Sequence, residues 1–100
     1  MKLAKAKLVT IVIENELKDK LIQDLKKFSI KGYTIKDAKG EGLNNKNIDQ
    51  WSGGNSYIEI IVKEEKALKI LEHLNNKYLG KYSCIVYLSD VEVLREEKFS

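Results

Sequence analysis

Two short glycine-containing segments are the parts of this 100-residue sequence best suited to meet a phosphate. Gly40 and Gly42 flank Glu41, and Gly80 precedes Lys81. A backbone without a Cβ can approach a phosphate closely, and an ammonium can neutralise one. The first segment lacks the full dinucleotide-binding fingerprint, and the chain contains no Gly-Lys-Ser/Thr phosphate loop. Each segment is weak evidence alone and gains weight only from its place on a loop.

Side chains that could carry covalent or acid–base chemistry are not arranged for it. The sequence shows no Ser-His-Asp or Cys-His set, and its carboxylates lie mostly among lysines on predicted helix faces. We expect His73 to be a solvated residue on a helix surface. Cys84 lies in an apolar run and should be a small core residue, because nothing near it in the sequence would lower the pKa of its thiol. The chain is therefore not expected to be an enzyme.

Residues 39–55 form a long polar segment that contains the single tryptophan. Compact domains rarely carry so long a connection unless it is functional. Trp51 lies there with Ile48, and an aromatic side chain on a loop can anchor in a partner's pocket. The alternative, in which Trp51 folds back onto its own sheet or a neighbouring subunit, is equally open. Gly53-Gly54 predicts a turn into the next strand.

Composition narrows the possible partners and compartments. The 18 basic and 15 acidic residues give a net charge of +3 and are mixed along the chain, without the basic stripe typical of nucleic-acid binding. The single cysteine excludes an intrachain disulfide and favours a reducing compartment. No apolar run could span a bilayer, and the first residues lack a signal-peptide cleavage site. We therefore expect a cytoplasmic protein with no nucleic-acid partner.

Hydrophobic periodicity predicts one domain over residues 1–100. β-branched or alternating runs predict strands at residues 8–13, 30–38, 56–63 and 83–88, with a short extra strand at 91–94. Apolar residues at helical spacing predict two helices: Leu17, Leu21, Leu25 and Phe28 after the N-cap Asn15, then Ala67, Ile70, Leu71 and Leu74. The order βαββαβ predicts an α+β, ferredoxin-like fold, an antiparallel sheet with both helices on one face.

The strand patterns also predict self-association. Residues 8–13 and 83–88 are apolar on both of their alternating faces, yet two helices can cover only one face of a sheet. A second copy of the chain is the economical cover for the other face. The alternative is a monomer whose second face is partly solvated, helped by Glu59 and Lys63.

Several segments together resemble the PII-like signalling proteins. They are Gly32-Tyr33-Thr34-Ile35, the glycines at 40 and 42, residues 77–88 and Val91-Glu92-Val93-Leu94. The resemblance is nearest to the SbtB branch, which regulates bicarbonate uptake in cyanobacteria, and to the carboxysome-associated PII proteins. It covers residues 7–99, and its specificity comes from the combination rather than from one motif.

The resemblance implies a PII-like homotrimer with an adenine nucleotide (AMP, ADP, ATP or cAMP) as effector in each cleft between subunits. The nucleotide would lie between a long T-loop, here residues 39–55, and a short B-loop, here residues 77–82. In such proteins the T-loop changes order with the nucleotide and docks on a target, here implied to be a bicarbonate transporter. The chain would then act in the cytoplasm or at the membrane periphery through that partner. Whether bicarbonate or a divalent cation binds as well stays open.

Nucleotide-binding roles carry over from the resemblance position by position. Thr34 matches a threonine close to the adenine, where a hydroxyl can donate to and accept from a base edge. Gly40 and Gly42 match the glycines at the T-loop root. Gly80 and Lys81 lie in the B-loop, where backbone N–H groups and an ammonium would meet phosphate.

The sequence also departs from the family pattern. Glu41 and Asn44 stand where the bicarbonate-regulating branch usually has basic residues, so phosphate contacts there would be either reduced or supplied by Lys39 and Lys46. Arg95 follows the last strand and could reach a neighbouring cleft. The chain also lacks the tyrosine-bearing T-loop sequence of the nitrogen-regulating PII proteins, which argues against uridylylation. The preferred nucleotide therefore stays open.

Two other interpretations use the same fold. One is a CutA-like metal-tolerance trimer, which should show clustered metal ligands and a different loop pattern. The other is a trimer without a small ligand that docks on a partner through Trp51. Nucleotide binding separates the PII-like interpretation from the trimer without a small ligand, and copper or zinc binding would support the CutA-like one.

Overall fold

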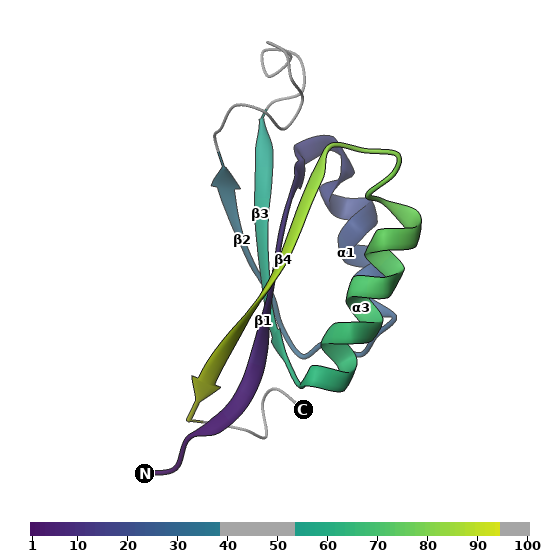
Figure 1. Ribbon diagram of the computed structural model, residues 1–100. Coiled ribbons are helices and arrows are strands. Elements are labelled where there is room, and N and C mark those ends of the chain that lie inside the picture. Colours follow the sequence, from purple (N-terminus) through teal and green to yellow (C-terminus); the bar gives the residue numbers. More distant parts are fainter. Residues whose placement is uncertain (39–53, 95–100) are drawn as a thin grey trace.

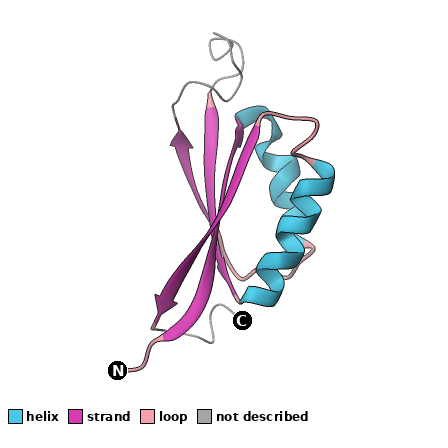
Figure 2. Cartoon of the chain, viewed as in Figure 1, coloured by secondary structure: helices cyan, strands magenta, loops and turns pink. Residues whose placement is uncertain are grey.

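The computed structural model describes residues 1–38 and 54–94 of the chain. The elements in this part are β1 (Ala4–Glu14), the 3-10 helix η1 (Asn15–Leu17), α1 (Lys18–Lys26), β2 (Thr34–Ala38), β3 (Asn55–Val62), α3 (Glu64–Lys77) and β4 (Cys84–Val93). Both α-helices lie on the same face of the sheet (Figures 1 and 2). The predicted ferredoxin-like α+β fold is confirmed. No helix in this part of the chain has the length and apolar content needed to cross a membrane.

β1 is a central strand of the sheet. The strand order is β2-β3-β1-β4, and every neighbouring pair is antiparallel. In the middle of β1, Ile11 lies opposite Ile58 of β3 and Val86 of β4. This order is the split βαβ arrangement, in which a helical crossover joins two strands that are not neighbours.

The hydrophobic core lies between the helices and the sheet. It combines alternate residues of β1 and β3 with the apolar stripes of the helices: Val9, Ile11, Ile13, Ile58, Ile60, Val62, Leu21, Leu25, Ala67, Ile70 and Leu74. None of these side chains is more than 2% exposed. Burying one large aliphatic side chain fully contributes about 1.5–3 kcal/mol, so this layer is a large favourable contribution to folding.

Element boundaries differ from the predicted ones where polar residues find partners. β1 begins at Ala4 rather than at residue 8, because Lys7 lies opposite Asp90 and forms an ion pair with it, while Lys5 lies opposite Glu92. The extra strand predicted at 91–94 is the continuation of β4 rather than a separate element. β2 begins only at Thr34.

Asn15 is not the predicted N-cap of α1. The chain enters α1 through η1, and no side chain caps either helix start. Asn15 instead joins β1 to β3: its backbone N–H donates to the carbonyl of Gly54 at 3.0 Å, and its side-chain oxygen accepts a hydrogen bond from the Ser56 hydroxyl. The helix start is therefore fixed by tertiary contacts rather than by a local cap.

The sheet face opposite the helices, called here the helix-free face, is apolar over three strands. Leu8, Val12 and Ile61 are half-buried there, while Ile85 and Tyr87 of β4 are 48% and 44% exposed. The hydroxyls of Tyr57 and Tyr87 lie 2.9 Å apart and join β3 to β4 across β1. The predicted two-sided apolar character of β1 and β4 is therefore confirmed, with one side left open in the single chain.

Gly54, which leads into β3, supplies a stability test. Its φ of +91° lies in the region that side chains rarely adopt, so Gly54→Ala should lower the free energy of unfolding by about 1–2 kcal/mol. Gly32→Ala is the matched control, because a Cβ at Gly32 meets nothing within 4 Å and its φ is ordinary. We expect that control to be neutral or slightly stabilising in urea denaturation. Equal losses in both variants would contradict the role assigned to Gly54.

Candidate functional site

The turn after α3 presents Gly80 and Lys81 to solvent. Tyr78 directly follows the helix and is only 1% exposed, and its N–H donates to the Leu74 carbonyl at 2.9 Å. The Tyr78 carbonyl accepts the N–H groups of Lys81 at 3.1 Å and Tyr82 at 3.0 Å. Both N–H groups are thus already paired, so in this conformation the ammonium of Lys81 is the better group to meet an anion.

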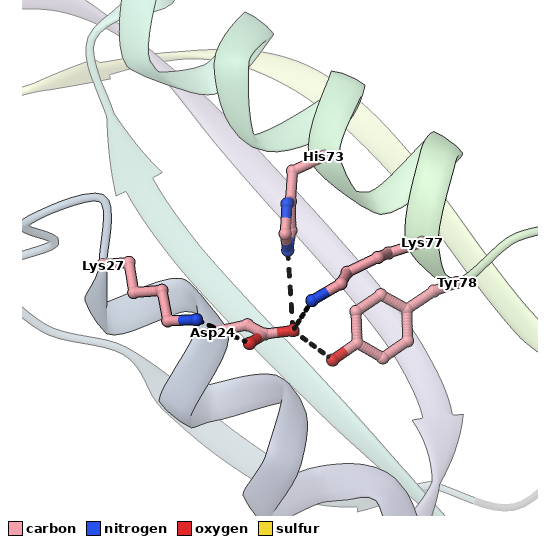
Figure 3. Close-up of polar contacts among 5 residues, drawn as sticks. All are labelled: Asp24, Lys27, His73, Lys77 and Tyr78. Carbon is pink, nitrogen blue, oxygen red and sulfur yellow. Dashed lines mark hydrogen bonds and ion pairs between the residues drawn. The ribbon is translucent and has the colours of Figure 1, made fainter.

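A buried carboxylate of α1 holds Tyr78 in place. Asp24 is 7% exposed and accepts a hydrogen bond of 2.6 Å from the Tyr78 hydroxyl. Figure 3 shows three nitrogen-bearing side chains around the same carboxylate: His73 Nε2 at 3.5 Å, Lys77 Nζ at 3.9 Å and Lys27 Nζ at 3.6 Å. Burying a carboxylate is costly unless such partners compensate it.

The contact between Asp24 and Tyr78 shifts their pKa values in opposite directions. The hydrogen bond from Tyr78 lowers the pKa of Asp24 below its ordinary 3.8 and outweighs the opposing effect of burial; His73, Lys77 and Lys27 lower it further. Burial, reinforced by the bond to Asp24, raises the pKa of Tyr78 well above its ordinary 10.0. At neutral pH Asp24 is therefore ionised and Tyr78 keeps the proton that it donates.

Lys20, one turn before Asp24 in α1, makes a second contact with this turn. Its Nζ lies 6.0 Å from the ring centroid of Tyr78 and 5.6 Å from that of Tyr82, and the two ring centroids are 5.8 Å apart. A cation over aromatic rings at this range contributes about 0.5–1 kcal/mol at an exposed site. The side chains of α1 thus contact the turn in two places.

The C-terminal end of β1 lies between two loop roots. On one side Asn15 bonds Gly54, where the chain returns from residues 39–53. On the other side Ile13 pairs with Cys84, the first residue of β4, where the chain returns from the turn that carries Lys81. Burial raises the pKa of Glu14 above its ordinary 4.5. The end of one strand therefore links both loop roots to the sheet.

Thr34 lies apart from Gly80 and Lys81. It is exposed at the start of β2, beside a surface cavity of about 270 Å³ that Tyr33 and Glu59 also line. β2 and β4 form opposite edges of the sheet, so three strand spacings, about 14 Å, separate Thr34 from β4. One chain does not bring these predicted residues together.

The remaining predicted ligand-binding and docking residues lie outside the described part of the chain. They are Lys39, Gly40, Gly42, Lys46, Ile48, Trp51 and Arg95. Their roles stay predictions.

A family model described as nitrogen regulatory protein P-II matches residues 6–98. The chain belongs to the P-II family. The predicted PII-like resemblance is thereby confirmed, and it is favoured over the CutA-like interpretation. Among residues 1–38 and 54–94, the structure shows no group of three or more His, Cys, Asp or Glu side chains that could hold a metal ion.

Solved structures extend this P-II assignment over the whole chain. A proposed PII-like signalling protein from Thermus thermophilus is 43% identical, with 100% of both chains covered and a TM-score of 0.86. CPII, a nitrogen regulatory PII-like protein from Thiomonas intermedia, bound to ADP, AMP and bicarbonate, is 27% identical, with 98% of this chain and 100% of that chain covered and a TM-score of 0.82. CPII bound to ADP and bicarbonate is 26% identical, covers 99% of this chain and 98% of that one, and gives a TM-score of 0.85. The comparison with curated proteins gives no significant match.

The prediction for His73 in this P-II domain was wrong. Its side chain is only 24% exposed, and its ring packs edge-on against Phe28 at 5.4 Å and Tyr78 at 6.4 Å between centroids. His73 lies three residues after Ile70 and so borders the apolar stripe of α3, where Asp24 gives it a polar partner. The prediction for Cys84 is confirmed, because it packs against the core and burial raises the pKa of its thiol to about 11.

The sequence did not predict that two residues of α1, Lys20 and Asp24, contact Tyr78 in the B-loop. Asp24 did carry a signal, since it lies three residues after Leu21 and directly before Leu25, in the apolar stripe of its helix. An acid in such a position needs a buried partner. No local pattern identifies Tyr78 as that partner, because the two residues meet only through the packing of α1 against α3.

Protonation of Asp24 should lower the free energy of unfolding in acid. Its folded pKa lies below 3.8, so its stabilising contribution is present above about pH 4 and is lost as the pH falls through the folded value. Asp24→Asn should remove this part of the pH dependence and lower the free energy of unfolding at neutral pH by about 1–3 kcal/mol.

Denaturation from about pH 3 to neutral pH measures this effect, with Asp19→Asn as the control because Asp19 is an exposed acid on the same helix. The control should keep the wild-type acid profile. An Asp24→Asn profile parallel to that of the wild type would contradict the prediction.

Proposed function

We propose that this P-II family protein is a signal transducer that binds an adenine nucleotide in clefts between the subunits of a homotrimer. The nucleotide would set the order of the T-loop, residues 39–55, and the T-loop would report to a membrane transporter, for which the SbtB-like resemblance favours one that carries bicarbonate. The observation that carries the proposal is the whole-length likeness to CPII, whose structures are bound to ADP, AMP and bicarbonate.

The described B-loop supports binding of the phosphates. Lys81 is exposed at the tip of the turn, next to Gly80, and its ammonium can pair with a phosphate as a point charge. ADP and ATP should therefore bind more tightly than adenosine. The other proposed phosphate contacts come from the T-loop and from beyond β4: Lys39, Gly40, Gly42, Lys46 and Arg95.

The arrangement of the sheet supports a site shared between subunits. Thr34, proposed for the adenine, lies at the β2 edge, while the B-loop leads into β4 at the opposite edge. A nucleotide in one cleft could contact both only if a second copy supplies one of them. The exposed apolar side chains of Ile85 and Tyr87 support self-association through the helix-free face. The number of subunits, three, follows from the family resemblance.

The proposed output is regulation rather than catalysis. Trp51 and Ile48 would dock on the target, and the protein would act in the cytoplasm and reach the membrane only through that partner. A ligand that favours one loop conformation shifts the population offered to the target, so nucleotide binding alone can carry the message. Bicarbonate or a divalent cation could bind with the nucleotide and bias the same equilibrium.

Calorimetric titration with AMP, ADP, ATP and cAMP tests nucleotide binding, and the fluorescence of Trp51, the single tryptophan, reports on the T-loop. We expect saturable binding near one nucleotide per chain. Lys81→Ala should weaken ADP binding about tenfold, because one charged hydrogen bond to phosphate is lost. Lys69→Ala removes an exposed lysine of α3 and should change nothing. No binding of any of the four at millimolar concentration would overturn the proposed function.

Light scattering tests the assembly. The wild-type mass should be three times the 11.5 kDa of one chain. Ile85→Lys places a charge on the helix-free face and should give monomers that also bind ADP poorly. Leu68→Lys is the matched control, because Leu68 is similarly exposed, at 53%, but belongs to α3. An Ile85→Lys protein that keeps both its mass and its ADP affinity would contradict a site formed across the helix-free face.

A further inference from the structure

Two side chains of α1, one helical turn apart, hold the B-loop. Lys20 and Asp24 lie four positions apart and so share one face of the helix. They meet Tyr78 and Tyr82, which also lie four positions apart: Asp24 through the hydroxyl of Tyr78, and Lys20 through both rings. Figure 3 shows the Asp24 half of this contact, with the carboxylate of α1 facing side chains from the end of α3.

The Asp24–Tyr78 contact is strong because it is buried. The two residues are 7% and 1% exposed, and the hydrogen bond between them is 2.6 Å long. A hydrogen bond to an ionised group is stronger than a neutral one, and water competes little at such a site. Moving the Tyr78 ring away would leave the carboxylate without its shortest bond. The side chain of Tyr78 is therefore fixed relative to α1.

Fixing Tyr78 also fixes the backbone that carries Lys81. Only Leu79 and Gly80 stand between the two residues, and the Tyr78 carbonyl accepts the N–H groups of both Lys81 and Tyr82. The position of Tyr78 thus sets where on the surface the Lys81 side chain begins. Asp24 acts on this exposed lysine through the buried tyrosine.

We propose that Asp24, assisted by Lys20, is a positioning residue for nucleotide binding. It holds the B-loop in the shape that presents Lys81 to the phosphates, while Asp24 itself touches no nucleotide. This inference rests on the proposed function. It adds a role for α1, an element that contains none of the predicted binding residues. The phosphate-dependent part of the affinity should therefore depend on a carboxylate in the helix layer.

Amide hydrogen exchange of the nucleotide-free protein tests the anchoring itself. Tyr78→Phe keeps the ring and removes only the hydroxyl, so the amides of Lys81 and Tyr82 should exchange about tenfold faster, while the core amides of β1 and β3 change only as much as the measured loss in the free energy of unfolding accounts for. Asp24→Asn should act in the same direction. Asp19→Asn makes the same charge change on the exposed side of α1 and should leave all rates unchanged. Unchanged B-loop exchange in both Tyr78→Phe and Asp24→Asn would overturn the proposal.

A double-mutant cycle on ADP affinity tests the consequence for binding. Tyr78→Phe should weaken ADP binding about fivefold in the wild-type background and change it little in the Lys81→Ala background, because the group that it positions is then gone. Losses in ADP affinity that simply add would indicate a general structural role for Tyr78. They would overturn the proposed positioning role but leave the proposed function standing. If the wild type binds no nucleotide, the proposed function fails with it, whereas faster exchange would still support anchoring of the B-loop by α1.

Discussion

The antiparallel pairing of β1 with β3 on one side and with β4 on the other is the interaction on which the rest of the structure depends. Because both pairings are antiparallel, the end of β1 lies beside the start of both neighbours: Glu14 faces Asn55, and Ile13 faces Cys84. These starts are where residues 39–53 and the B-loop rejoin the sheet. Two loops far apart in sequence thus have their roots at one end of one strand, and the buried side of that strand anchors both to the core.

The same sheet has more surface than its helices can cover. α1 and α3 lie on one face, and the helix-free face keeps Ile85 and Tyr87 about half exposed. A chain of 100 residues has a modest core, so covering a second face by self-association would add stability that one copy lacks. Association would also join a Thr34 edge to a B-loop edge, as the proposed site requires. One contact between copies would therefore cover the exposed face and also complete the divided site.

The fold could be predicted because its determinants are periodic and local. The β-branched run around Ile11 and the stripe of Leu21 and Leu25 indicate their structure within a few residues. The early start of β1 could not be predicted, because Lys7 looks like a loop residue until Asp90 is placed opposite it. The link from Asp24 to the B-loop was missed for the same reason, since the sequence can indicate a buried polar residue but not its partner.

The buried charge of Asp24 is better understood as a source of specificity than of stability. An apolar residue would complete the stripe of α1 without the desolvation penalty, and buried ion pairs often stabilise no more than a well-packed apolar substitute. An apolar residue would, however, let the Tyr78 hydroxyl turn elsewhere, whereas the carboxylate accepts it in one position. The B-loop is then ordered before any ligand arrives. Less of the binding energy is therefore consumed in ordering this loop, and more remains for the changes that a signalling protein must make when its ligand binds.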